Sequence, residues 1–111
     1  MRYRIEYTKE TKGHFQALSA RQCSLLLDAV EVQLASQPAV QTRNRKQMRP
    51  NALATWELRV GNLRVYYDVI EEAPPTVVVR AVGVKERKQV RIGGRQVGDE
   101  VLQDDEDPGR D

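Results

Sequence analysis

The sequence predicts an α+β fold of order β-α-α-β-β-β, with two N-terminal helices packed on one face of a mainly antiparallel four-stranded sheet. Three observations support this prediction. Alternating apolar and charged residues open the chain, two segments with helical spacing follow, and three strand-like segments joined by turn residues come last. At 111 residues, the chain has the size of a single domain.

The first strand and the first helix are expected at the N-terminus. Residues 2–7 alternate between the two faces, which is typical of a strand with one buried side. Thr8 is placed to cap a short helix over residues 9–18. Phe15 and Leu18 should lie on the buried side of this helix.

A second helix is expected to begin at Ser19, because Ser19 and Gln22 have the spacing of a capping box. It should end near Gln37, since Pro38 disfavours a helical conformation in the residue before it. Apolar residues recur along it at helical spacing: Cys23, Leu26, Leu27, Val30 and Leu34.

Three strands are expected in the rest of the chain, over about 54–60, 63–70 and 76–84. The first two flank Gly61-Asn62, a favoured two-residue hairpin turn. The third is so apolar that it should lie centrally in the sheet. Segment 42–51 has four cations and no apolar period, so it is predicted to be irregular.

A two-residue turn fixes the hairpin register and sets Arg59 opposite Arg64. The apolar face should pack on the helices, joined by Val77, Val79 and Ala81. The members of that face on the hairpin are Trp56, Leu58, Val60, Leu63, Val65, Tyr67 and Val69. The opposite, open face would present Glu57, Arg59, Arg64, Tyr66, Asp68 and Arg80.

The opposed arginines are a candidate phosphate site. Like charges across a strand pair cost a few tenths of a kcal/mol or more. An arginine fork binds phosphate oxygens in pairs, which would compensate for that cost. The alternative is a solvated sheet face on which Glu57 and Asp68 neutralise the arginines.

Charge is distributed unevenly along the chain. The net charge is +2, yet residues 99–111 hold seven acidic residues and one basic residue. The other 98 residues hold 17 basic and nine acidic residues, a net charge of +8. A basic body indicates a polyanionic partner such as nucleic acid, with a merely solvated surface as the alternative. We predict one domain over residues 1–95 and an acidic, disordered tail over 96–111.

Composition narrows the classes of protein further. Hydrophobic residues make up 40% and charged residues 31% of the chain, as in ordinary soluble domains. The single cysteine, Cys23, excludes an internal disulfide and supplies no metal cluster. No apolar run reaches the roughly 18–20 residues of a membrane span, and the charged N-terminus is unlike a signal peptide. A cytoplasmic protein without metal or other cofactor is expected.

The chain resembles the RelE/ParE family of bacterial toxins from type II toxin–antitoxin systems. The hairpin ATWELRVGNLRVYYDV (54–69) and the strand VVVRAVGVKERKQV (77–90) carry the resemblance. The helix LLLDAVEVQL (25–34) and the basic segment TRNRKQMRPN (42–51) add to it. The resemblance covers roughly residues 2–92 and implies a RelE-like fold with the element order predicted above.

The resemblance also implies a function. Many members are endonucleases that cut mRNA in the ribosomal A site and inhibit translation, whereas ParE-like members poison DNA gyrase without nuclease chemistry. By position, Arg64 matches the arginine that holds the scissile phosphate, Arg59 a basic residue on the preceding strand, and Lys85 the basic residue after the last strand. An mRNA interferase is predicted, with a ParE-like gyrase toxin or a weakly toxic antitoxin-binding member as alternatives.

Two positions depart from the nuclease pattern. Glu57 stands where well-characterised nucleases carry a basic residue, and we expect it to act as the catalytic base beside Arg59, Arg64 and Lys85. Arg91 stands where many carry a tyrosine or histidine. The sole histidine, His14, is expected to be a surface or packing residue. Nucleic acid should be bound by further side chains around the site: Arg43, Arg45, Lys46, Arg49, Tyr66, Arg80, Arg87, Lys88 and Arg91.

The expected partners follow from the same resemblance. A cognate antitoxin should bind by groove insertion or strand addition. Leu18, Leu25 and Val32 are candidate contacts, because the second helix has more apolar positions than one buried stripe needs, although they could equally be core. The other expected partners are mRNA and the ribosome, with operator DNA bound through the antitoxin, and no membrane is expected.

Overall fold

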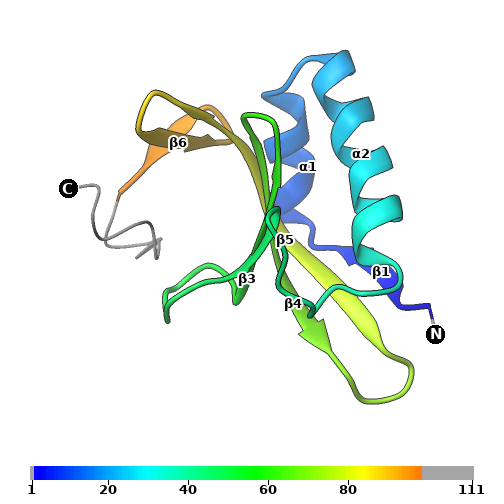
Figure 1. Ribbon diagram of the computed structural model, residues 1–111. Coiled ribbons are helices and arrows are strands. Elements are labelled where there is room, and N and C mark those ends of the chain that lie inside the picture. Colours follow the sequence, from blue (N-terminus) through cyan, green and yellow to red (C-terminus); the bar gives the residue numbers. More distant parts are fainter. Residues whose placement is uncertain (1, 99–111) are drawn as a thin grey trace.

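Two helices lie against one face of a twisted sheet in the computed structural model, which describes residues 2–98 (Figure 1). The predicted acidic tail therefore falls mostly outside the described residues. The elements are β1 (Arg4–Tyr7), α1 (Glu10–Gln16), α2 (Ala20–Leu34), β2 (Arg45–Gln47), β3 (Trp56–Val60), β4 (Leu63–Ile70), β5 (Thr76–Glu86), β6 (Gln89–Ile92) and β7 (Arg95–Val97).

The sheet has the strand order β2-β3-β4-β5-β6-β7, and β1 pairs with β5. The β1–β5 pair is parallel and the other pairs are antiparallel. β5 hydrogen-bonds to three strands, so its predicted central position is confirmed. The α+β class and the helices on one face are also confirmed, but the described chain has seven strands where four were predicted.

The additional strands lie in two places. β2 falls within the segment predicted to be irregular, and that prediction is wrong where Arg45 pairs with Leu58. β6 and β7 form a hairpin closed by Gly93 and Gly94, whose φ angles of 64° and 81° suit glycine. β7 crosses the boundary at residue 95 where the domain was predicted to end.

The helices differ from their predicted ends. The Ser19–Gln22 capping box is present, but α2 ends at Leu34 rather than near Gln37. The predicted Thr8 cap of α1 is wrong, because the Thr8 hydroxyl donates to the carbonyl oxygen of Arg80 at 3.4 Å instead.

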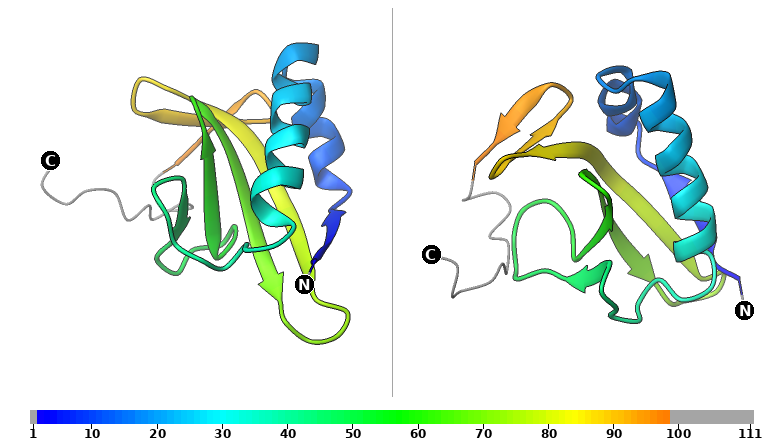
Figure 2. Two further views of the ribbon diagram at one scale, coloured as in Figure 1. Left: turned by 45° about the vertical axis from the view of Figure 1, so that its right-hand side comes forward. Right: turned by 45° about the horizontal axis from the view of Figure 1, so that its top comes forward.

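The main core lies between the helices and the sheet. Leu26, Val30 and Leu34 of α2 pack on apolar side chains of β3, β4 and β5. Part of the predicted apolar face is fully buried here, including Leu58 and Val65, as the alternation predicts. The helices cover this face in all views (Figure 2).

A β-bulge in β5 changes which residues face the helices. Tyr66 pairs with Ala81 and Tyr67 with Val79, so Arg80 is the extra residue. After the bulge, Val82 packs in the helix-side core, whereas Ala81 packs on the opposite face with Tyr66. The prediction that Ala81 joins the helix-side core is therefore wrong.

The face away from the helices has a smaller core of its own. Met48, Tyr66, Ala81 and Val90 are buried there. The segment between β2 and β3 lies on this side of the sheet (Figure 1), and the β6–β7 hairpin contributes Val90. The predicted open face is thus partly covered by two short segments of the chain itself.

Candidate functional site

The β3–β4 hairpin places Glu57 between the two opposed arginines. The predicted register is confirmed, with Arg59 opposite Arg64 and Glu57 opposite Tyr66. Arg59 Nε donates to Glu57 Oε1 at 2.9 Å, and Arg64 Nε lies 3.8 Å from Glu57 Oε2. One carboxylate therefore compensates for two like charges, which explains how the hairpin tolerates them.

Arg64 also braces the turn that joins β3 to β4. Its Nη1 donates to the carbonyl oxygens of Gly61 at 2.8 Å and Leu63 at 2.9 Å. Its buried Nε has no hydrogen-bond partner among residues 2–98. A buried donor without an acceptor costs about 1–3 kcal/mol, and the charge of the Glu57 carboxylate, 3.8 Å away, offsets part of this cost.

Lys85 is positioned beside the same turn. Its backbone N–H donates to the carbonyl oxygen of Asn62 at 2.7 Å. Gly83, two residues earlier, pairs with Arg64, so Lys85 and Arg64 are on one face of the sheet. Glycine is required at this pairing, because a Cβ atom on Gly83 would collide with the carbonyl oxygen of Arg91.

The candidate site is more enclosed than the sequence predicts. The side chain of Glu57 is 3% exposed, and Tyr66 is fully buried. Tyr66 cannot stack on a base in this conformation, so its predicted role as a base platform is not supported. Arg59 remains 27% exposed and provides the accessible side of the cluster. We call Glu57, Arg59, Arg64 and Lys85 the hairpin cluster.

Arg45 of β2 pairs with Leu58 on the helix side of the sheet and has a structural role. Its guanidinium donates to the carbonyl oxygens of Val40 at 2.9 Å and Gln33 at 3.0 Å, and to the Gln33 side chain at 3.0 Å. Burial raises the pKa of the Tyr67 phenol nearby, and the charge of Arg45 opposes this shift. The prediction that Arg45 binds nucleic acid is therefore wrong for this conformation.

Arg91 points away from the hairpin cluster. It pairs with Val84 on β5, on the helix side of the sheet. There its Nε lies 3.7 Å from a carboxylate oxygen of Glu86, and both residues line a cavity of about 200 Å³ next to Ala17, which follows α1. Arg91 thus lies outside the hairpin cluster.

The other cations predicted to bind nucleic acid lie outside the hairpin cluster. Arg80 forms an ion pair with Asp68, with Nε 2.8 Å from Oδ2. The remaining cations are exposed: Arg43, Lys46 and Arg49 lie in or beside β2, and Arg87 and Lys88 form the β5–β6 turn. The structure therefore brings Glu57, Arg59 and Arg64 into contact and places Lys85 on the same face of the sheet, but it does not gather all of the predicted nucleic-acid-binding side chains.

The predicted antitoxin contacts divide into two groups. Leu18 packs against the helix-side core, in agreement with the alternative prediction that it is a core residue. Leu25 and Val32 are exposed on α2, and Val32 has a relative exposure of 76%. The outer face of α2 thus carries apolar side chains that the fold does not use.

His14 has a packing role, as predicted. Its Nδ1 accepts a hydrogen bond from the N–H of Val82 at 3.4 Å. Burial lowers its pKa, and the charge of Glu10 opposes this shift. Within residues 2–98, no three His, Cys, Asp or Glu side chains gather as metal ligands, and neither helix is long and apolar enough to cross a membrane.

Comparison with solved structures identifies the fold. The chain is similar to a chain of the toxin–antitoxin complex RelBE2 from Mycobacterium tuberculosis, with a TM-score of 0.63 and 22% sequence identity. The match covers 77% of this chain and 100% of the other. No protein-family profile and no curated protein matches the chain. The likeness establishes a shared fold and agrees with the RelE-like fold predicted from the sequence.

Proposed function

We propose that this chain is the toxin of a type II toxin–antitoxin system and acts as an mRNA endoribonuclease. The observation that carries the proposal is the hairpin cluster. It holds one carboxylate between two guanidinium groups, Lys85 lies on the same face of the sheet, and the Arg64 Nε donor has no described hydrogen-bond partner. The RelBE2 fold and the family resemblance support the same class of protein.

The cluster can perform metal-independent RNA cleavage. The Glu57 carboxylate takes the proton of the 2′-hydroxyl, and the 2′-oxygen then forms a bond to the adjacent phosphorus. The bond between phosphorus and the 5′-oxygen breaks, and Lys85 gives the leaving oxygen a proton. Lys85 is assigned this role because arginine does not lose its proton in proteins. The products are a 2′,3′-cyclic phosphate and a 5′-hydroxyl, and water restores both protonation states.

The arginines stabilise the charge that develops on the phosphate. Arg59 and Arg64 already lie on either side of the Glu57 carboxylate, so a phosphate oxygen at the cluster would be near both guanidinium groups. Because Glu57 is 3% exposed, the substrate must approach from the more exposed Arg59 side.

The outer face of α2 is proposed as part of the antitoxin-binding surface. The similar structure is a toxin–antitoxin complex, and Leu25 and Val32 are exposed apolar residues here. Their burial by a partner helix or strand would remove this apolar surface from water. The ribosome and mRNA are proposed as the targets, with operator DNA bound through the antitoxin, and the cytoplasm as the compartment.

A ParE-like toxin that acts on DNA gyrase is the second candidate. Arg91 lies on the helix side of the sheet, so the hairpin cluster lacks a side chain from the position where many nucleases have a terminal tyrosine or histidine. A toxin without nuclease chemistry would not need a tyrosine or histidine at this position. A weakly toxic chain that mainly binds its antitoxin would tolerate this loss as well.

Induction in cells separates the candidates. Mapping of mRNA 5′ ends and of gyrase-linked DNA breaks should give new mRNA ends for the wild-type chain and fewer for Arg59→Ala, by about a hundredfold. Arg21→Ala, an exposed cation on α2, is the matched control and should cut like the wild type. DNA breaks with intact mRNA would establish the gyrase-directed function instead, and the absence of any growth defect would leave the weakly toxic chain.

A further inference from the structure

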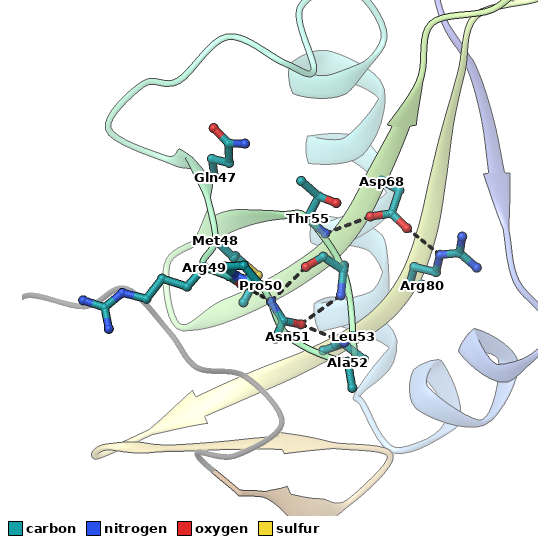
Figure 3. A pocket seen from close by; sticks show the side chains of 11 residues that line it. Gln47, Met48, Arg49, Pro50, Asn51, Ala52, Leu53, Thr55, Asp68 and Arg80 are labelled. Atoms are coloured by element: carbon teal, nitrogen blue, oxygen red, sulfur yellow. Dashed lines mark hydrogen bonds and ion pairs between the residues drawn. The ribbon is translucent and has the colours of Figure 1, made fainter.

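A second cavity lies on the side of the sheet that bears the hairpin cluster. It has a volume of about 660 Å³ and is formed by the segment 47–55 together with Asp68 and Arg80. Figure 3 shows this segment looping past the Asp68–Arg80 pair. The volume is within the range of small-molecule sites, about 300–1,000 Å³.

The wall of the cavity is held in a defined shape by Asn51. Its Oδ1 accepts hydrogen bonds from the N–H groups of Leu53 at 2.7 Å and Ala54 at 3.1 Å. Its Nδ2 donates to the carbonyl oxygens of Arg49 at 2.7 Å and Ala54 at 3.0 Å (Figure 3). A loop fixed in this way is preformed, which lowers the entropic cost of binding a ligand.

The opposite wall is the Asp68–Arg80 pair. Asp68 Oδ1 accepts from the N–H of Thr55 at 2.8 Å, and Asp68 Oδ2 accepts from Arg80 Nε at 2.8 Å. This arrangement engages Nε of Arg80 and leaves its two terminal nitrogens as a pair of parallel donors. The Arg80 side chain is 45% exposed, so these donors are accessible to a ligand.

The cavity is connected to the hairpin cluster through β4. Arg64, Tyr66 and Asp68 alternate along this strand and share its helix-free face. Four residues of a strand span about 13 Å, so the cavity lies close enough to receive a nucleotide adjacent to the one at the cluster.

We propose that this cavity binds an unpaired guanine base of the RNA, next to the phosphate that is cut. The parallel donors of Arg80 match the O6 and N7 acceptors of guanine, the commonest specific contact of arginine with a base. Met48, Pro50 and Leu53 provide apolar atoms for the faces of the ring. A phosphate fits less well, because the carboxylate of Asp68 in the wall repels it.

The proposal rests on the proposed function, and its test does not require cleavage. The probes are RNA trinucleotides with 2′-O-methyl groups, which cannot be cut: UGU, UAU, UCU, UUU and U-abasic-U. Their affinity for the full chain is measured by fluorescence anisotropy at low salt. UGU should bind about tenfold more tightly than UUU or the abasic probe.

Two variants test whether the preference for UGU arises at this cavity. Arg80→Gln should remove the tenfold preference for UGU, whereas Arg21→Ala, an exposed cation on α2, should retain it. On binding UGU, the backbone amide signals of Leu53 and Ala54 should shift, because both residues line the cavity. Thermal unfolding of each variant confirms that the fold is retained.

Four results would overturn the proposal: equal affinity for UGU and the abasic probe, tighter binding of a trinucleotide with another base, an unchanged preference in Arg80→Gln, or amide shifts confined to other segments. Failure of the proposed function would be distinct. In that case UGU would be preferred in vitro although no mRNA ends are generated in cells. The converse result, mRNA cleavage without guanine preference, would overturn only the cavity assignment.

Discussion

The two faces of the β3–β4 hairpin are buried by different means. On the helix side, Leu58 and Val65 are fully buried under α2. On the other side, Glu57 and Arg64 are buried in an ion-paired cluster beneath short segments rather than a helix. Burial of apolar groups stabilises a fold, whereas burial of charges is neutral or costly unless they are well paired. The helix side therefore contributes most to stability, and the other side holds its charges through ion pairs and through the hydrogen bonds of Arg64 to the turn.

Leu58→Ala should have the largest effect on stability. Leu58 is fully buried in the helix-side core, and the cavity left behind should lower the free energy of unfolding by about 2–5 kcal/mol. Urea denaturation measures this change. A loss below about 1 kcal/mol would contradict the assignment of this face as the main source of stability.

Arg45→Ala should lower stability nearly as much, although the residue is a cation. It removes three hydrogen bonds to Val40 and Gln33 and leaves their oxygens without these donors, at a cost of about 2–3 kcal/mol. Lys46→Ala is the control, because Lys46 is exposed and its loss should cost less than about 0.5 kcal/mol. Equal stability of the two variants would argue against a structural role for Arg45.

Arg87→Gly should raise stability slightly. Arg87 has a φ of 62°, a conformation that costs a non-glycine residue about 1 kcal/mol or more. Glycine removes this strain but has a larger conformational entropy in the unfolded chain, so a net gain of roughly 0.5 kcal/mol is expected. Thermal unfolding measures the gain, and a lower melting temperature would show that the turn is not strained.

The smallest expected effect is on the pH dependence of the melting temperature. Burial lowers the pKa of His14 below its usual value, so the unfolded chain binds the proton more readily than the folded chain. This contribution to stability is fully present above about pH 6.5 and is lost as the pH falls below that value. The decrease in melting temperature from pH 7 to pH 5.5 should be smaller in His14→Gln. The same decrease in both proteins would exclude a contribution from His14.

Local patterns predicted much of the fold. The Gly61-Asn62 turn fixed the hairpin register, and the Ser19–Gln22 capping box located the start of α2. The β6–β7 hairpin was missed although alternating Val90 and Ile92 precede a Gly-Gly turn, a pattern that favours a hairpin.

Other features depend on tertiary contacts and have no local signal. The extra residue at Arg80 arises from the pairing of β4 with β5, so alternation along β5 alone could not predict that Ala81 faces away from the helices. Likewise, nothing in the run of cations distinguishes Arg45, which bonds to α2, from the exposed Lys46. The hairpin register predicted that Glu57, Arg59 and Arg64 share a face, and the family resemblance added Lys85, but neither predicted the burial of Glu57.

Glu57→Gln is the most direct test of whether the hairpin cluster cuts RNA. This substitution keeps the size of the side chain and removes the base. With purified protein, ribosomes and mRNA, we predict 2′,3′-cyclic phosphate ends from the wild type. The variant should cut at a rate lower by about a hundredfold or more, and a circular dichroism spectrum like that of the wild type should show that it remains folded. Equal cleavage rates for the variant and the wild type would show that Glu57 is not the base and that the hairpin cluster does not cut RNA in the proposed way.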